Sequence, residues 1–370
     1  MPEDERRRII LSEQGKMVER SGNRIGGDRH RGSGRRLHQR GTVRVIAVSY
    51  HNRVNVLQPP GFASAAPFDR AEWFALLAKE GGLDPFIALA ADGTHTLAMP
   101  LMREGRMLVP LANWYSFFWR PLATPGANQP ALLQAIARKL GRQAHRIVLW
   151  PLPDEDRSAT MLAAAFGAAG WIVLREACDT NHILRVSGRS YEEYLAGRPG
   201  TLRTTLKRKA KKVEVEIHTS FDPAAWAAYE AIYAASWKPA EGKPAMLRRF
   251  AEEEGAAGRL RLGIALAEGK PLAAQFWTVE SDTAFIHKLA HVEEAGPLSA
   301  GTVLTAALFE HVIDQDRVEM VDFGTGDDPY KAMWMEETRP RFRLECLRPA
   351  NPANWPRLAR AGLRKLRDRT

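Results

Sequence analysis

Residues 284–323 read AFIHKLAHVEEAGPLSAGTVLTAALFEHVIDQDRVEMVDF. The stretch begins with an apolar strand, passes through a loop at Gly296-Pro297, and continues with apolar residues at helical spacing over 302–313. It ends on a second apolar strand, VEMVDF (318–323). This order of strand, loop, helix and strand is typical of one unit of an α/β fold, so it predicts the architecture of the region around it.

The same order of elements occurs earlier in the chain. Residues 86–151 predict two strands joined by Asp92-Gly93, then a hairpin, a helix over 131–140 and a strand over 146–150. Residues 261–326 predict the matching set, with a turn at 268–270. We therefore predict a duplicated α/β domain with mixed sheets (α+β) rather than a solenoid, the alternative being chance similarity of two ordinary segments.

Length and charge set the broad class of protein. The 370 residues exceed what one hydrophobic core usually fills, so two domains are expected. The net charge of +10 is confined to the ends: residues 1–44 carry +6, residues 348–370 carry +6, and the middle carries −2. Because attraction to polyanions needs basic groups gathered on one surface, we expect no nucleic-acid partner. Two cysteines, Cys178 and Cys346, suit a reducing compartment, so we expect a cytoplasmic protein.

Four segments follow from these patterns. Residues 1–42 are basic, rich in glycine and poor in large apolar side chains, which predicts a disordered basic leader; a nucleic-acid-binding arm is the alternative. A first α/β domain over 43–185 and a second over 186–347 contain the two copies. The tail, 348–370, is basic and amphipathic; we expect a helix docked on its own domain, with weak peripheral membrane contact as the alternative. No run approaches the ~20 apolar residues of a membrane-spanning helix.

The second copy resembles the GNAT acyltransferases. The features that carry this resemblance are Tyr233-Ala-Ala-Ser-Trp-Lys238, GKPLAAQ (269–275), PLSAGTVL (297–304) and DFGTGDDPYKAMW (322–334). Together they are similar to the CelD/BcsL-like subfamily, which has two GNAT-type folds in tandem and is distantly related to Fem-type peptidyltransferases. The resemblance covers residues 190–345 well and 45–180 as a degenerate copy. It implies two tandem GNAT-like folds, the first of them catalytically silent.

The resemblance further implies acyl-CoA-dependent transfer of an acyl group, such as acetyl, to an amine. The acceptor expected from it is a sugar, an amino acid or a cell-envelope or polysaccharide precursor. Two alternatives stay open: Fem-like transfer of an aminoacyl group from tRNA, motivated by the basic stretch RPGTLRTTLKRKAKK (198–212), and a scaffold that binds without turnover. No metal is expected, because the sequence lacks zinc-ligand spacing.

In that family the connection before the long helix binds the coenzyme A diphosphate. This places acetyl-CoA or another acyl-CoA at Ser299, Ala300, Gly301 and Thr302. Successive backbone N–H groups at a helix N-terminus attract phosphate, and a glycine lets the diphosphate approach. Relatives commonly carry Ser-Pro-Gly here, whereas this chain has Ser-Ala-Gly, and a plain helix start capped by Ser299 is the alternative. Leu289, on the preceding strand, is also expected to contact the cofactor.

Attack of an amine on a thioester needs a base, a donor to the developing oxyanion and an acid for the leaving thiolate. The resemblance suggests His287 as the base, on a strand that a β-bulge would separate from its neighbour. It suggests Tyr330 as the acid and Asp322 as a group that orients the amine. The alternatives are a histidine hydrogen-bonded across the sheet, a packed aromatic beside Trp334, and a carboxylate that caps the turn at Gly324.

Five further residues are expected to bind the substrate: Gln275, Trp277, Trp237, Lys238 and Lys331. Gln275 lies in an otherwise apolar strand, so it must face a cleft or be hydrogen-bonded. Trp237 could equally be a core residue, and Lys331 would pair with a phosphate or an acceptor carboxylate unless it is simply solvated. Three aromatic residues of the silent copy are expected to line the acceptor groove or to pack between the halves: Trp114, Tyr115 and Phe117.

Overall fold

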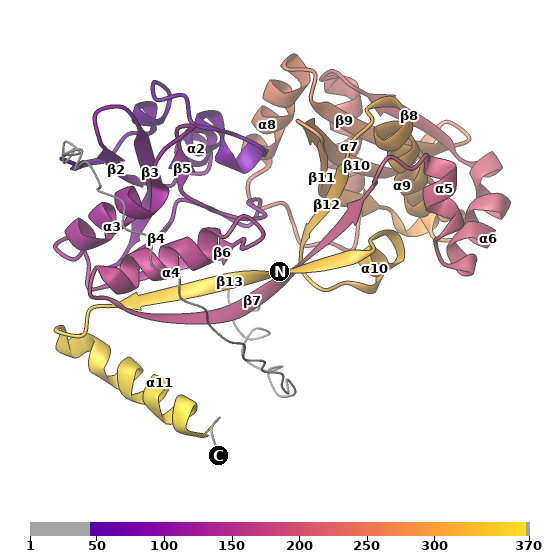
Figure 1. The fold of residues 1–370 in the computed structure, drawn as a ribbon. Coiled ribbons are helices and arrows are strands. Elements are labelled where there is room, and N and C mark those ends of the chain that lie inside the picture. The colour runs from indigo at the N-terminus through magenta and orange to yellow at the C-terminus, as the bar shows by residue number, and fades with distance from the viewer. Residues whose placement is uncertain (1–44, 368–370) are drawn as a thin grey trace, which may run out of the picture. The chain divides into compact units, whose positions relative to one another are not determined.

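A computed structural model of the chain describes residues 45–367, apart from the side chains of residues 365 and 366. The predicted leader, residues 1–42, lies outside the described residues. The helices and strands come in two successive sets that repeat the same order (Figure 1). From Ile46 onward they belong to one compact unit.

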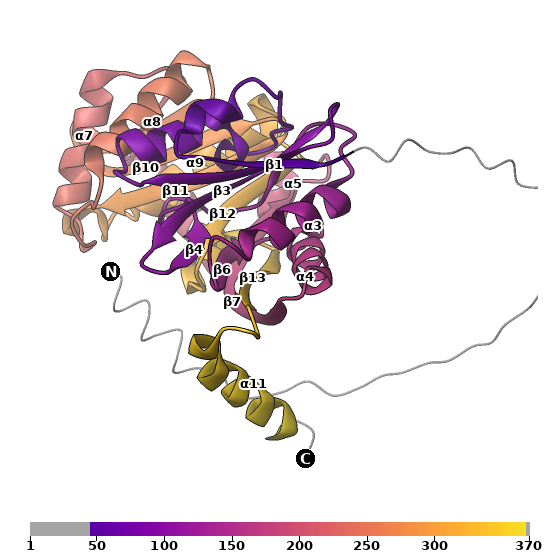
Figure 2. The same ribbon diagram turned by 90° about the vertical axis from the view of Figure 1, so that its left-hand side faces the viewer.

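The first set runs from β1 to β7. Its members are β1 (Ala47–His51), α2 (Ala71–Lys79), β2 (Pro85–Ala91), β3 (Thr96–Glu104), β4 (Met107–Pro110), β5 (Leu122–Ala123), α3 (Gln129–Leu140), β6 (Arg146–Leu152), α4 (Ser158–Ala168) and β7 (Ile172–Arg185). Both predicted elements near its end, the helix over 131–140 and the strand over 146–150, are confirmed. Figures 1 and 2 show α3 and α4 packed side by side in this half.

The second set runs from α5 to β13. Its members are α5 (Tyr191–Ala196), α6 (Gly200–Lys209), β8 (Glu214–His218), α7 (Pro223–Ala234), α8 (Pro244–Ala256), β9 (Leu260–Ala267), β10 (Lys270–Glu280), β11 (Thr283–His291), α9 (Ala300–Glu310), β12 (Met320–Thr325), α10 (Pro329–Trp334) and β13 (Glu337–Leu347). A last helix, α11 (Trp355–Arg367), follows. The predicted start of α7 is confirmed, because Asp222 Oδ1 accepts from the N–H groups of Ala224 and Ala225, with Pro223 at the first helical position.

Thirteen strands of the described residues form one mixed sheet, as the predicted fold class requires. Their order is β1-β2-β3-β4-β6-β13-β7-β12-β11-β10-β9-β8, with β5 paired to β3. Each half has four antiparallel strands and then one parallel step, from β4 to β6 in the first half and from β11 to β12 in the second. Helices α3 and α9 supply the crossovers that parallel pairs need, so the duplicated arrangement is confirmed.

The last strand of each half pairs with the other half. β7 follows α4 of the first half, and its end pairs with β12 of the second. β13 follows α10 of the second half and pairs with β6 of the first, while β7 and β13 pair with each other over most of their length. The predicted domain boundary at 185/186 coincides with the end of β7, but the exchange of strands ties the two halves into one sheet.

Helices cover both faces of the sheet, and alternate side chains of a strand enter different cores. Phe276 of β10 packs with Trp226 of α7 and Phe250 of α8. Its neighbour Trp277 packs instead with Phe309 of α9. The period of two in a strand dictates this division. Helix α9 therefore lies on the opposite face of β10 from α7 and α8.

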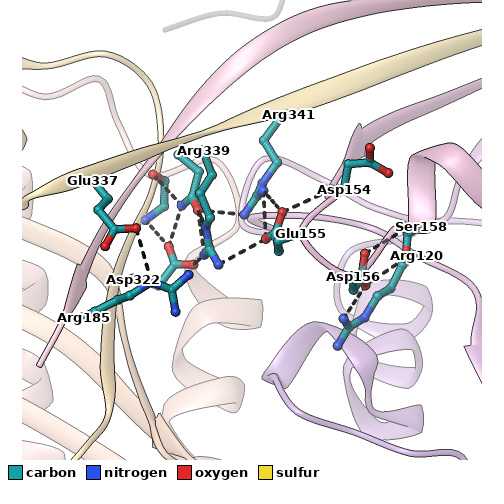
Figure 3. Close-up of polar contacts among 12 residues, drawn as sticks. Arg120, Asp154, Glu155, Asp156, Ser158, Arg185, Asp322, Glu337, Arg339 and Arg341 are labelled. Atoms are coloured by element: carbon teal, nitrogen blue, oxygen red, sulfur yellow. Dashed lines mark hydrogen bonds and ion pairs between the residues drawn. The ribbon is translucent and has the colours of Figure 1, made fainter. Parts of the chain in front are cut away.

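Buried charged groups connect the halves where β7, β12 and β13 meet (Figure 3). The side chain of Arg341, fully buried in β13, donates to Asn181 Oδ1 (2.7 Å) and to Glu155 Oε2 (3.0 Å). Arg339, on the same strand, pairs with Asp322 (3.0 Å) and Glu155 (3.2 Å). Asn181 in turn donates to Asp322 Oδ1 (2.7 Å). We call these five residues the arginine clamp; their charges face opposite charges, as burial requires.

Replacing Arg341 tests the clamp. The Arg341→Met variant should lose about 1–3 kcal/mol of unfolding free energy, because Asn181 Oδ1 and Glu155 each lose one arginine partner and keep only Arg339. The matched control is Arg343→Met on the same strand, where the side chain is 35% exposed and the ion pair to Glu176 spans 3.7 Å. That variant should lose less than about 1 kcal/mol. Urea denaturation measures both, and equal losses would contradict the clamp.

Candidate functional site

Strands β11 and β12 separate after three paired residues. Thr283, Ala284 and Phe285 pair with β12, and beyond them no described strand pairs with this edge of β11. The predicted bulge is present. Phe276 of β10 pairs with Lys288 of β11 and Trp277 pairs with Ile286, so His287 is the extra residue without a partner on β10. The second half of β11 therefore has a backbone edge without a strand partner, facing away from β10.

Helix α9 begins beside this edge with amides that the chain itself does not use. Ser299 has a φ of 53°, in the left-handed region that costs a non-glycine residue about 1 kcal/mol or more. The N–H groups of Leu298 and Ser299 close a turn onto Ala295 and Gly296. Within the described chain, the N–H groups of the next three residues donate to no acceptor: Ala300, Gly301 and Thr302. Ser299 makes no side-chain cap, so the predicted alternative of a serine-capped start is not what the structure shows.

Of the three residues, only Gly301 and Thr302 are in part accessible to solvent. Both are half-buried, whereas Ala300 is fully buried. A Cβ on Gly301 would lie 3.4 Å from the ring of His291, so the glycine keeps the approach open. Unused donors at the positive end of an eleven-residue helix are groups that commonly hydrogen-bond anions in proteins, and Gly301 and Thr302 are the two that are not fully buried.

A polar network on β10 holds this first turn in place. Gln275 Nε2 donates to Thr305 Oγ1 (2.6 Å) and to the carbonyl of Gly301 (3.2 Å), and Trp277 Nε1 donates to Gln275 Oε1 (2.9 Å). Gln275 is 1% exposed and Trp277 is fully buried. The substrate contacts predicted for these two residues do not fit this position, because α9 covers both. The second possibility given for Gln275, a hydrogen-bonded buried amide, is what the structure shows.

Tyr330 of α10 reaches the same network. Thr305 has one hydroxyl proton and donates it to Gly301 O (2.8 Å), so the Tyr330 hydroxyl donates to Thr305 Oγ1 (2.7 Å). Burial raises the pKa of Tyr330, which keeps the phenol protonated at neutral pH, as an acid requires. The structure thus places Tyr330 beside the first turn of α9, and its catalytic role stays a prediction.

His287 occupies an aromatic environment on the opposite face of the sheet. Its Nε2 is 2.7 Å from the Thr278 hydroxyl. Burial, and then the charges of Lys288 and Arg70, lower the pKa of His287 to about 3. Five aromatic rings surround it: Phe68, Phe117, Phe250, Phe276 and Phe285. This environment fits the histidine hydrogen-bonded within the sheet better than the predicted general base.

Asp322 belongs to the arginine clamp. It is 1% exposed, and its Oδ1 accepts from the N–H of Gly324 (2.8 Å). Its other oxygen pairs with Arg339. With both oxygens engaged inside the sheet, Asp322 caps the turn at Gly324, which was the alternative to orienting an amine.

A cluster of charged groups lies near the end of β11. Lys288 forms an ion pair with Glu241 (2.8 Å), and the Tyr115 hydroxyl donates to the same carboxylate. Burial, and then the charges of Lys288 and Lys331, lower the pKa of Lys238 to about 8. We call Tyr115, Lys238, Glu241, Lys288 and Lys331 the lysine cluster. Three of its members were predicted at the site: Tyr115, Lys238 and Lys331. Tyr115 contacts Lys288, and Lys331 is near enough to Lys238 for its charge to lower the pKa of that amine.

Trp237 connects the lysine cluster with the start of α9. The side chain is exposed, and its ring centroid lies 4.3 Å from that of His291, whose ring also faces Gly301. Trp237 is therefore not a core residue. Glu241, Lys288 and His291 were missed by the sequence analysis. An acidic residue in the lysine-flanked loop KPAEGK (238–243) was the signal available for Glu241, while nothing in the local pattern marked Lys288.

The first half lacks an equivalent anion site at the start of α3. Asn128 accepts from Ala131 N–H through its side chain, and Gln129 N–H donates to Ala127. Pro130 has no N–H to offer. The first turn of α3 is thus closed by its own residues, in agreement with a degenerate first fold. Its aromatic residues contact the second half: Tyr115 reaches Glu241, Trp114 packs against Gly242, and Phe117 packs against His287.

Residues 200–332 match the family model described as an acetyltransferase (GNAT) domain. This span, which is less than half of the chain, is similar to a GNAT-type acetyltransferase domain. It contains β11, α9, β12 and most of α10, hence the strand separation, the free amides and Tyr330. No curated protein sequence matches the chain.

Solved structures share the fold across both halves. FemX gives a TM-score of 0.57 at 8% identity, with 80% of this chain and 96% of that chain covered. The C-terminal domain of a protein described as a lysylphosphatidylglycerol synthetase from Agrobacterium fabrum gives 0.52 at 15% identity, covering 76% and 88%. L-PGS from Bacillus licheniformis gives 0.51 at 11% identity, covering 79% and 96%. At these identities the similarity concerns the fold alone, and it supports the predicted tandem architecture.

The lowered pKa of Lys238 predicts its reactivity. Because about half of this amine is neutral at pH 8, it should react with acetic anhydride with a midpoint near that pH. The Lys331→Gln variant removes one neighbouring positive charge, so its midpoint should move upward. Competitive isotope labelling read by mass spectrometry gives both curves. A midpoint near the ordinary lysine value of about 10.4 would contradict the burial of this amine.

Proposed function

We propose that the chain is an acyl-CoA-dependent N-acyltransferase of the CelD/BcsL-like kind, which transfers an acyl group to an amine of a sugar, an amino acid or a cell-envelope precursor. The observation that carries this proposal is the start of α9. Its three unused amides lie beside a strand edge that no described strand covers. Diphosphate and pantetheine are the two chemical parts of coenzyme A that such a pair of features suits.

The residues around the start of α9 fit a phosphorylated ligand. Gly301 and Thr302 offer N–H donors at a helix N-terminus, and Ser299 precedes them in a strained left-handed conformation. Lys209 of α6 donates to the carbonyl of Pro297 (2.8 Å), which brings a positive charge next to the loop. Leu289 is half-buried on the second half of β11, where a pantetheine arm would run. Ser299, Ala300, Gly301, Thr302 and Leu289 are therefore the proposed cofactor residues.

Acetyl-CoA supplies the activated acyl group, and the chain supplies positioning, charge stabilisation and proton transfer. Backbone N–H groups on the free edge of β11 are suited to hydrogen-bond the thioester oxygen as it becomes negative. The Tyr330 hydroxyl is the proposed proton donor to the departing thiolate: it is protonated, and its hydrogen bond to Thr305 Oγ1 is exchanged for one to the sulfur. Glu241 is held between the Tyr115 hydroxyl and Lys288, so in place of a role for His287 we propose that it orients the incoming amine.

The lysine cluster forms the acceptor side of this proposal. Trp237 is exposed beside His291 and would stack on the acceptor. Lys238 and Lys331 are close enough to affect each other electrostatically, and together they would bind an acidic group of the acceptor. Tyr115 brings the silent half to the acceptor side through Glu241.

A charge placed in the amide site tests the cofactor assignment. The Gly301→Glu variant should bind acetyl-CoA at least about tenfold more weakly, because a carboxylate would lie where the diphosphate is proposed to bind. Gly167→Glu in α4 is the matched control, since a side chain there meets open space. Isothermal titration of the full-length chain measures affinity, and circular dichroism confirms that both variants fold. Unchanged affinity in folded Gly301→Glu would contradict the diphosphate site.

A second variant separates catalysis from binding. Tyr330→Phe should lower turnover by about a hundredfold or more while leaving acetyl-CoA affinity within about twofold, because only the proton donor is lost. Release of the free thiol of coenzyme A, followed with a panel of amino sugars and amino acids, gives the rate. Absence of any amine-dependent thiol release in the unsubstituted protein that binds acetyl-CoA would favour the non-enzymatic scaffold instead.

A further inference from the structure

Helix α11, at the end of the chain, has two chemically distinct faces. At about 100° per residue, Trp355, Leu358 and Leu363 project within one sector of the helix. Three arginines project from the opposite sector: Arg357, Arg360 and Arg364. No acidic residue occurs from Cys346 to Arg367. The helix therefore combines a narrow apolar stripe with a purely basic opposite face.

The apolar stripe is not packed into a core. Trp355 is 59% exposed and Leu363 is 66% exposed, so the docking of this tail on its own domain, predicted above, is not what the structure shows. The base of the helix is nevertheless fixed. Asn354 is fully buried and donates to the carbonyls of His145 (2.8 Å) and Arg348 (2.9 Å). The start of the helix is anchored while its apolar stripe stays exposed. Exposed apolar surface of this kind commonly marks a binding site for another molecule.

The surface next to this base has the same chemistry. Arg348 precedes α11, and its guanidinium lies at the end of α3, 3.2 Å from the position that a Cβ on Gly141 would take. The last turn of α3 and the loop that follows it carry three exposed basic side chains: Arg138, Lys139 and Arg142. Ile172, which pairs with Leu347 at the end of β13, is 41% exposed. Basic and apolar groups thus continue from α11 onto the end of the sheet.

We propose that α11 and the adjoining end of α3 bind the surface of an anionic lipid bilayer, with α11 lying in the interface. Its tryptophan and leucines enter the boundary between headgroups and acyl chains, and the arginines contact lipid phosphates. Each basic side chain near an anionic surface contributes about 1 kcal/mol, so the cluster is strong enough for reversible attachment. Among the described helices none is long and apolar enough to cross a bilayer.

Charge complementarity favours lipid over a second copy of the chain as the occupant. A second copy packed against the apolar stripe would cover that stripe alone and leave the basic faces of both helices without an acidic partner. Glu345 is the acidic residue that pairs with α11, through Arg357 at 3.5 Å, and it is already engaged with Arg146. An anionic bilayer, by contrast, offers both an apolar interior and a continuous negative surface to the two faces at once.

Flotation of the full-length chain with vesicles tests the proposal. The protein should float with phosphatidylcholine vesicles that contain about one third phosphatidylglycerol, stay behind with pure phosphatidylcholine, and dissociate as salt is raised. Leu363→Asp should reduce the bound fraction at least about tenfold, since a charge enters the apolar stripe. Arg360→Glu combined with Arg364→Glu should do the same. Arg249→Glu on α8, an exposed arginine elsewhere, is the matched charge control and should bind normally.

Three results would overturn the proposal. The first is no flotation with anionic vesicles by the folded protein. The second is equal flotation of Leu363→Asp and the unsubstituted chain, which would place the contact elsewhere. The third is a dimer, seen by light scattering without lipid, that becomes a monomer in Leu363→Asp, which would identify a second copy as the occupant. Circular dichroism and an unchanged melting temperature show that Leu363→Asp is folded, as the exposure of this side chain leads us to expect.

Discussion

Strands β11 and β12 stop pairing after Phe285, and the first turn of α9 lies beside the place where they separate. If the two strands had continued to pair, the backbone N–H and C=O groups along this edge of β11 would be hydrogen-bonded to β12. The separation is supported on both sides. A bulge at His287 alters the register against β10, and the Gln275 side chain ties β10 to the carbonyl of Gly301. The free amides of α9 are thus held by buried hydrogen bonds rather than by a mobile loop.

The two halves of the molecule differ at this same place although they share one topology. In the first half, the first turn of α3 offers no unused N–H groups like those of α9, because Asn128 accepts from Ala131 and Pro130 has no N–H. That half contributes support in other ways. Its strand β6 pairs with β13, its residue Glu155 holds two arginines of the clamp, and its Tyr115 bonds Glu241. The first half therefore differs from the second at the start of its crossover helix while it supports the second half through the exchanged strands.

Local patterns in the sequence predicted the elements well and their partners poorly. Hydrophobic periodicity and the turn residues were enough for α3, α9 and the strands around them, because these signals come from neighbouring residues. The exchange of β7 and β13 could not be predicted, since pairing of strands far apart in the chain leaves no local mark. For the same reason no local pattern indicated that Lys288, Glu241 and Tyr115, from three separate parts of the chain, would meet.

The predicted site residues divide according to burial, which one sequence does not specify. The start of α9 was recognisable because the donors are backbone groups whose availability follows from helix geometry. The roles of His287, Asp322 and Gln275 depended instead on what surrounds each side chain, and in all three the structure favours the structural alternative. Trp237 shows the converse, because a tryptophan after an apolar helix is exposed here.

The central claim is that the amides of Gly301 and Thr302 bind the diphosphate of an acyl-CoA. Transverse-relaxation-optimised NMR of the deuterated, nitrogen-15-labelled chain during titration with coenzyme A observes these two N–H groups directly. We expect both resonances to shift strongly on binding, and to shift much less with pantetheine, which lacks the diphosphate. Unmoved Gly301 and Thr302 resonances under saturating coenzyme A would contradict the account.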